Sequence, residues 1–138
     1  LVSTDFSELS KYAITYAAEL GATLGATLVI VHVYQMPPML MPGPYGISAE
    51  LAERIPKEAG ELLEATAKEA AHAKVHVRTV LREGDPRDQI LAVAESEKAD
   101  LLVMGTHGRR GLSRALIGSV AEAALRAAPC PVLTVHPH

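Results

Sequence analysis

The residues best suited to chemistry form a glycine-rich segment, residues 105–119, with the sequence GTHGRRGLSRALIGS. Gly105 follows an apolar run, and Gly108 lacks a side chain that would block the approach of a ligand to the backbone. Gly118 and Ser119 come directly before a segment with helical periodicity. Because the backbone N–H groups at a helix start bind anions well, this segment predicts a phosphate-binding loop.

Three further features of this segment bear on that interpretation. Ser119 with Glu122 matches a capping box, so we expect a helix to begin there with its N–H groups directed out of the sheet. A third glycine, Gly111, favours a binding loop over an ordinary turn. The same segment contains three arginines that could add positive charge: Arg109, Arg110 and Arg114. The arginine side chains are equally compatible with a solvated surface. The Gly-Lys-Ser/Thr ending of a P-loop and the tight G-x-G-x-x-G of a dinucleotide site are both missing, so neither class of site is predicted.

A second polar segment, residues 3–7 with the sequence STDFS, follows the apolar start of the chain. The carboxylate of Asp5 suits a hard divalent cation bound to phosphate oxygens, although Asp5 is also compatible with a turn ahead of Ser7. In an open parallel sheet, ligands bind beyond the carboxyl ends of the strands, where two adjacent loops diverge. We expect residues 3–7 and 105–119 to be those two loops.

Other conspicuous residues have structural interpretations. His32 lies within an apolar strand and is expected to be a hydrogen-bonded core histidine with no catalytic role. The methionines of the proline-rich residues 34–48 indicate a lid or an interface, since no histidine or cysteine accompanies them as a metal ligand. The segment 37–48 is expected to be poorly ordered without a ligand or partner. Cys130, between two prolines, is expected to be structural.

Helices and strands alternate along the chain in a pattern typical of α/β proteins. Apolar, β-branched runs predict strands, and apolar residues spaced by three and four predict helices. The first helix is capped by Ser7, is expected to bury one stripe and can stop at Gly21 or Gly25. That stripe contains Leu9, Ala13, Tyr16, Ala17, Leu20 and Leu24. The other expected elements are strands at 27–33, 75–81, 101–104 and 132–135, and helices at 49–73, 86–98 and 119–127.

Two of these elements carry specific expectations. Pro56 is expected to start, kink or split the helix at 49–73, because it lacks a backbone donor. The strand at 75–81 alternates apolar and charged residues, which is typical of a sheet edge. Asp85 and Pro86 form a helix start, with an N-cap acceptor followed by proline at the first helical position. The alternation as a whole predicts a parallel sheet with helices on both faces.

Composition limits the class of protein. The 138 residues predict a single domain over residues 1–138, and 49% hydrophobic with 21% charged residues is ordinary for a folded chain. A net charge of −3 argues against nucleic acid or an anionic membrane as the main partner. One cysteine, no apolar stretch of about 20 residues and no signal peptide at the start lead us to expect a cytoplasmic protein. The first strand is expected to be truncated at its amino end.

The motifs together resemble those of the universal stress protein family. ATP-binding members carry G-x-x-G, nine residues and then G-[S/T], and here these positions are Gly105, Gly108, Gly118 and Ser119. The resemblance extends to STDFS, VHV, GDP, LLVMGTHGRRG and PCPVLTV, over nearly all of the chain. It implies a Rossmann-like α/β fold, a single open five-stranded parallel sheet of order 3-2-1-4-5. It also implies a homodimer through Val132–Val135, an edge strand with unpaired backbone groups.

The resemblance further implies ATP and Mg²⁺ as ligands. Val33 would contact adenine through its backbone, while Met104 and Gly105 would meet ribose or adenine. Ser3, Thr4 and Asp5 would line the nucleotide, with Asp5 near the magnesium ion. Phosphate contacts would come from Gly108, Arg109, Gly118, Ser119 and Val120, mostly through backbone N–H groups. His107 is expected to lie on the loop surface.

These features favour an ATP-binding stress-response module whose nucleotide occupancy is sensed by a partner or by the dimer. A slow ATPase at the same site is the enzymatic alternative. No nucleophile, histidine–carboxylate pair or P-loop lysine is evident, so fast phosphoryl transfer is not predicted. A flavodoxin-type FMN-binding domain is a third alternative, although residues 3–7 contain no glycine.

Overall fold

The computed structural model describes residues 1–37, 49–106 and 117–136. Strands and helices alternate as the sequence predicts, and each begins or ends within a few residues of its expected bounds. In chain order they are β1 (Val2–Thr4), α1 (Glu8–Leu24), β2 (Thr27–Tyr34), α2 (Ala49–Ala70), the 3₁₀ helix η2 (Ala71–Ala73), β3 (His76–Glu83), α3 (Pro86–Ser96), β4 (Leu102–Gly105), α4 (Ser119–Ala127) and β5 (Val132–Val135). The expected disorder at 37–48 concerns residues that, from 38 on, lie outside the described part of the chain.

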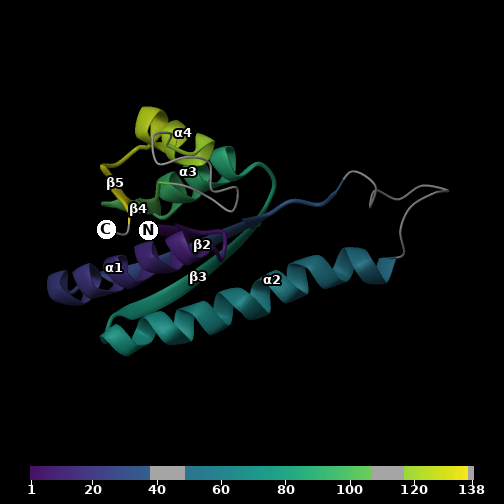
Figure 1. Ribbon diagram of the computed structural model, residues 1–138, viewed down its shortest axis with the longest axis horizontal. Helices are drawn as coiled ribbons and strands as arrows, with labels where there is room; N and C mark the ends of the chain where they lie inside the picture. The colour runs from purple at the N-terminus through teal and green to yellow at the C-terminus, as the bar shows by residue number, and fades with distance from the viewer. Residues whose placement is uncertain (38–48, 107–116, 137–138) are drawn as a thin grey trace.

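The five strands form one parallel sheet of order β3-β2-β1-β4-β5, which confirms the predicted topology. Helices α1 and α2 cover one face of this sheet, and α3 and α4 cover the other (Figure 1). Strand β3 lies at an edge, as its alternating pattern predicts, and β5 forms the opposite edge. Among the described residues no helix combines the length and hydropathy needed to cross a bilayer.

The core divides into two apolar layers because neighbouring residues of a strand point to opposite faces. Ile30 and Val103 pack on the face of α1 and α2, while Val31 and Leu102 pack on the face of α3 and α4. All four side chains are almost completely buried. The apolar run in β2 is therefore covered on both faces, as expected of a central parallel strand.

Helix α1 contacts the sheet through small residues, and the predicted stripe is wrong in part. Tyr16 and Leu24 are 41% and 68% exposed. The buried face instead contains Ser10, Ala13, Ile14, Ala17, Ala18 and Gly21. A Cβ atom at Gly21 would lie 3.1 Å from Val75 Cγ2, so the helix approaches its neighbours too closely for larger side chains there. The helix continues past Gly21 and ends at Gly25, whose φ of 63° suits glycine.

Pro56 neither starts nor splits α2, so two of the three outcomes expected of it are wrong. It lies inside a helix that runs continuously from Ala49 to Ala70 and is followed by η2. Because proline has no N–H, the carbonyl of Ala52, one turn earlier, loses its helical hydrogen bond. Ala52 and Pro56 are both only partly buried, so water reaches this side of the helix.

Helix α3 begins as predicted, with Asp85 as its N-cap and Pro86 at the first helical position. Asp85 Oδ1 accepts hydrogen bonds from the Arg87 backbone N–H at 2.9 Å and from Arg87 Nε at 3.0 Å. Arg87 Nη2 donates to Asp85 Oδ2 at 2.9 Å. The Arg87 side chain, together with its backbone N–H, lowers the pKa of the Asp85 carboxyl to about 2.

We predict that Asp85→Asn destabilises the fold near neutral pH, and that the difference from the parent shrinks between about pH 4 and pH 2. The pKa of Asp85 is lower in the folded than in the unfolded state, so its charge stabilises the fold above the unfolded pKa and this contribution is lost as pH falls through the folded pKa. Urea unfolding at a series of pH values measures the difference. Asp88→Asn removes the same charge from the same turn and serves as the control; an equal pH dependence in both variants would contradict the prediction.

Candidate functional site

The two polar loops of the sequence start from neighbouring strands at the carboxyl edge of the sheet. Strands β1 and β4 are parallel neighbours, with Val2 in register with Val103. The segment after Thr4 and the segment after Gly105 therefore leave the sheet side by side, as predicted. This is the place where the winding of the chain reverses direction, and in such folds it is where ligands bind.

Thr106 joins the end of β4 to the start of α4. Its N–H donates to the Val135 carbonyl at 3.3 Å, and its carbonyl accepts from the Gly118 N–H at 2.7 Å. Residues 106 and 118 are twelve positions apart in the sequence, yet this contact holds them together. The first turn of α4 is thereby fixed beside the carboxyl ends of β4 and β5.

The predicted capping box at the start of α4 is wrong. Gly118, not Ser119, is the N-cap, and no side chain accepts a hydrogen bond there. Ser119 occupies the first helical position, and the Glu122 carboxylate forms an ion pair with Arg126 instead of reaching back. The first N–H groups of a helix have no acceptor within it, and a glycine cap supplies none from its side chain. The start of α4 therefore suits an external anion better than a capping box would.

The backbone groups of Val33 face the β1 side of β2, at a position one residue past the end of β1. The Gly84 N–H donates to the Tyr34 carbonyl at 3.0 Å on the β3 side. Since backbone groups alternate in direction along a parallel strand, those of Val33 face the β1 side. The last β1 residue, Thr4, is in register with His32. The Phe6 N–H donates to Thr4 Oγ1 at 3.0 Å, so the chain after Thr4 does not continue alongside Val33.

The loop between β1 and α1 is held by its own polar side chains. Asp5 Oδ1 accepts from the Ser7 N–H at 3.0 Å and from Ser7 Oγ at 2.6 Å. The buried Thr4 hydroxyl lies 3.0 Å from Ser10 Oγ, and Ser7 Oγ accepts from the Ser10 N–H as the N-cap of α1. Thr4 therefore supports the loop from below, while Asp5 and the half-buried Ser3 lie at the outer end of β1.

Sequence reasoning missed two residues at this edge. Tyr34 ends β2, and its hydroxyl donates to Glu83 Oε2 at 3.2 Å; burial and this hydrogen bond raise the pKa of the phenol, which keeps it protonated. Thr106 acts through its backbone, so no side-chain pattern identifies it. Two predicted site residues, Gly108 and Arg109, lie outside the described residues, as do His107, Arg110, Gly111 and Arg114.

The remaining predicted residues lie at the end of β4 and at the start of α4. Met104 is buried in the layer under α3 and α4, and Gly105 is the last residue of β4. Ser119 is exposed and Val120 half-buried in the first turn of α4. Within residues 1–37, 49–106 and 117–136 no group of three or more His, Cys, Asp or Glu side chains is arranged to hold a metal ion. A cation bound to Asp5 at this edge would therefore take its other oxygen ligands from a bound molecule or from water.

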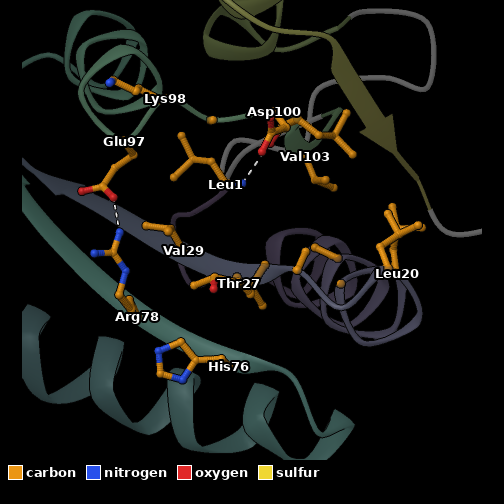
Figure 2. Close-up of a pocket in the computed structure, with 17 residues that line it drawn as sticks. Leu1, Leu20, Thr27, Val29, His76, Arg78, Glu97, Lys98, Asp100 and Val103 are labelled. Carbon is orange, nitrogen blue, oxygen red and sulfur yellow. Dashed lines mark hydrogen bonds and ion pairs between the residues drawn. The ribbon is translucent and has the colours of Figure 1, made fainter.

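A cavity of about 610 Å³ lies at the opposite edge, at the amino ends of the strands (Figure 2). It is lined largely by apolar side chains from α1, β2 and β4. Its polar groups already contact one another: Arg78 forms an ion pair with Glu97, and the Leu1 amine donates to the Leu101 carbonyl. None of the residues that line it belongs to residues 3–7 or to the described part of the 105–119 segment, so the cavity is separate from the candidate site.

Known proteins share both the sequence and the fold. The chain is 36% identical to universal stress protein MJ0531 of Methanocaldococcus jannaschii, over 98% of this chain and 79% of that protein. The solved structure of MJ0577 from the same organism superposes with a TM-score of 0.84 at 27% identity, covering 99% and 95% of the two chains. A universal stress protein solved in complex with cAMP superposes with a TM-score of 0.72 at 27% identity, covering 98% and 93%. The family model for universal stress proteins matches residues 1–136, and the chain therefore belongs to the universal stress protein family.

Proposed function

We propose that this protein binds ATP at the carboxyl edge of its sheet and that nucleotide occupancy is the signal it provides in a stress response. The observation that carries the proposal is the start of α4, a glycine-capped helix fixed by Thr106 beside the loop that contains Asp5. A structural relative solved with cAMP supports a nucleotide as the ligand. ATP itself is our extension of that finding to this chain.

The adenine would lie against the end of β2. The Val33 backbone faces the side of β2 that β1 leaves open, and a backbone carbonyl there suits the exocyclic amine of adenine. Met104 and Gly105 at the end of β4 would contact the ribose or the adenine. The nucleotide would thus extend from β2 across the end of β1 toward α4, with Ser3 along its path.

The phosphates would lie at the start of α4. Backbone N–H groups of Ser119 and Val120 are suitable donors, because a helix start attracts negative charge and Gly118 leaves the approach clear. Gly108 and Arg109 are proposed to complete the phosphate site from the preceding loop. Asp5 would share a Mg²⁺ ion with the phosphate oxygens, since Mg²⁺ prefers oxygen ligands and keeps several waters.

Slow ATP hydrolysis at the same site remains the enzymatic alternative, and a flavodoxin-type FMN site is the less favoured one. The hydroxyl and carboxylate that meet at the carboxyl edge, Ser7 and Asp5, already serve the loop and the cap of α1, which favours binding over fast chemistry. Native mass spectrometry of the freshly purified protein separates an adenine-nucleotide site from a flavin site, because ATP, FMN or no ligand would each give a different mass. The cytoplasmic location expected from the sequence stays a prediction.

We predict that Gly118→Val lowers ATP affinity by about a hundredfold while the protein stays folded. Gly118 has φ −62° and ψ 150°, a conformation open to any residue, so valine adds bulk without backbone strain. The added side chain would occupy the route by which phosphate reaches the N–H groups of α4, where charge-assisted hydrogen bonds form. Isothermal titration calorimetry measures the affinity, and circular dichroism checks the fold.

Gly118→Ser is the matched variant for this experiment. Its hydroxyl would cap α4 and stabilise the helix by only a few tenths of a kcal/mol relative to glycine, while competing with phosphate for the same N–H groups. We expect a higher melting temperature together with weaker ATP binding. If Gly118→Val binds ATP like the parent protein, the glycine segment is only a turn and the proposed function fails.

We predict that Asp5→Asn lowers ATP affinity about tenfold in the presence of Mg²⁺ and leaves it unchanged or higher in EDTA. The amide oxygen can still accept from Ser7, so the loop keeps its shape and only the charge is lost. Calorimetry in both buffers measures the effect. Ser7→Ala is the control: it removes the hydroxyl's hydrogen bond to Asp5 and the α1 cap but keeps the Ser7 N–H bond and the Asp5 charge, so the Mg²⁺ dependence should persist. An equal loss in both buffers for Asp5→Asn would exclude the metal role.

We further propose a homodimer formed by pairing of β5 strands. β5 ends the sheet, and its Pro131 and Val135 carbonyls accept from Leu102 and Thr106. By alternation, the backbone groups of Val132 and Thr134 point away from β4, toward the outside of the edge. An edge strand with apolar side chains and outward backbone groups is suited to pairing with a second copy about a twofold axis.

We predict that Thr134→Pro converts the dimer to a monomer and leaves the fold intact. Proline removes an outward N–H without removing a bond to β4, a position that proline tolerates in edge strands. Thr134→Val keeps the N–H and serves as the control. Light scattering coupled to size-exclusion chromatography at micromolar concentration measures the mass; a monomeric parent, or a dimeric Thr134→Pro protein, would refute pairing through β5.

A further inference from the structure

His32 is a buried polar residue in the central part of the sheet. It is 8% exposed, and its neighbours in the β2 sequence, Val31 and Val33, belong to the apolar run. Burying a polar ring is unfavourable unless it forms hydrogen bonds. As expected from the sequence His32 does form one, but its partner places it next to the candidate site.

The imidazole holds the peptide group at which the chain leaves β1. His32 Nδ1 lies 2.8 Å from the carbonyl oxygen of Thr4. A carbonyl can only accept, so Nδ1 carries the proton and donates. This carbonyl belongs to the peptide that joins Thr4 to Asp5, so the hydrogen bond sets the direction in which Asp5 leaves the sheet.

The same ring contacts the residue on the other side of Asp5. The ring centroids of Phe6 and His32 are 4.2 Å apart, with an interplanar angle of 37°. Phe6 has a φ of 63°, a left-handed conformation that is unfavourable for a residue other than glycine. Its N–H is held by Thr4 Oγ1 and its ring by His32 and the apolar layer, so contacts on both ends of the residue maintain this conformation.

We propose that His32 is a positioning residue for the β1–α1 loop: it holds the peptide before Asp5 and the side chain after it, and thereby presents the Asp5 carboxylate at the edge of the sheet. The role in ligand binding rests on the proposed function. Without His32 the loop would sample other conformations, and Asp5 would no longer be fixed toward a Mg²⁺–phosphate group. His32 itself need not touch the nucleotide.

Two substitutions separate the hydrogen bond from the packing. His32→Phe keeps an aromatic ring against Phe6 but removes the donor, whereas His32→Asn keeps an N–H donor at the δ position and removes the ring. His32→Gln, with its amide one bond farther from the backbone, replaces His32→Phe if that variant does not fold. Val93→Ala, in the other apolar layer, is the control for a general loss of stability.

Each variant is measured in two ways on the folded protein. Hydrogen exchange of the Ser7 amide, which donates to Asp5, reports the loop without any ligand. Calorimetry with ATP and Mg²⁺ reports the site. For His32→Phe we expect Ser7 exchange to rise about tenfold and Mg²⁺-dependent affinity to fall by five- to tenfold, the loss of about one hydrogen bond. His32→Asn should stay within about twofold of the parent, and Val93→Ala should change neither quantity.

A double-mutant cycle completes the test. In an Asp5→Asn background, His32→Phe should have little further effect on affinity, because the charge it positions is gone. Unchanged Ser7 exchange and affinity in His32→Phe, with only a lower melting temperature, would show His32 to be an ordinary core residue and overturn the proposal. If the parent does not bind ATP, the proposed function fails, and Ser7 exchange alone decides whether His32 positions the loop.

Discussion

The backbone of Thr106 connects three elements that are separate in the sequence, and the arrangement of the site depends on it. Through its N–H it is joined to β5, and through its carbonyl to the cap of α4. Since Gly105 is already paired within the sheet, these two bonds set where α4 starts relative to β4. Both backbone groups of this half-buried residue find partners, and together the two bonds hold the helix start against the strands.

Once α4 is fixed in this way, the two sides of the site have different character. The side at α4 consists of backbone N–H groups with no capping side chain, which suits negative charge. The side at β1 carries the carboxylate of Asp5, which alone would repel a phosphate. A divalent cation shared between Asp5 and the ligand reconciles the two sides, and this is the physical argument for Mg²⁺ in the proposed function.

Rigid support beneath each side is a common requirement for such a site. Beneath β1, Thr4, Ser10 and His32 form a buried polar cluster on the face covered by α1. Helix α1 packs on this face mostly through small residues, and Ser10 near its start lies close enough to bond Thr4. The cavity at the amino edge has no such polar cluster beneath it among the described residues. Its ion pair joins two of its own lining residues, Arg78 and Glu97 (Figure 2). Size alone therefore does not identify the functional edge of this molecule.

Features that depend on a few neighbouring residues could be predicted from the sequence. The cap of α3 at Asp85 and Pro86, the end of α1 at Gly25 and the buried run in β2 follow from local hydrogen bonding, backbone freedom and alternation. The strand order and the two loops at the carboxyl edge were also predicted, because the glycine and STDFS motifs resemble those of a family with a known topology.

Features that depend on distant partners were decided by the tertiary structure. Tyr16 fits a helical stripe by spacing, but it is largely exposed, because α1 turns a face of mostly small residues such as Ala13 and Ala17 to the sheet. Ser119 fits a capping box, but the bond between Gly118 and Thr106 starts the helix one residue earlier. His32 was recognised as a core histidine, whereas its partner, 28 residues away on β1, is defined only by the register of two strands. Local propensity specifies the elements, and long-range packing and hydrogen bonding decide which face and which atom each presents.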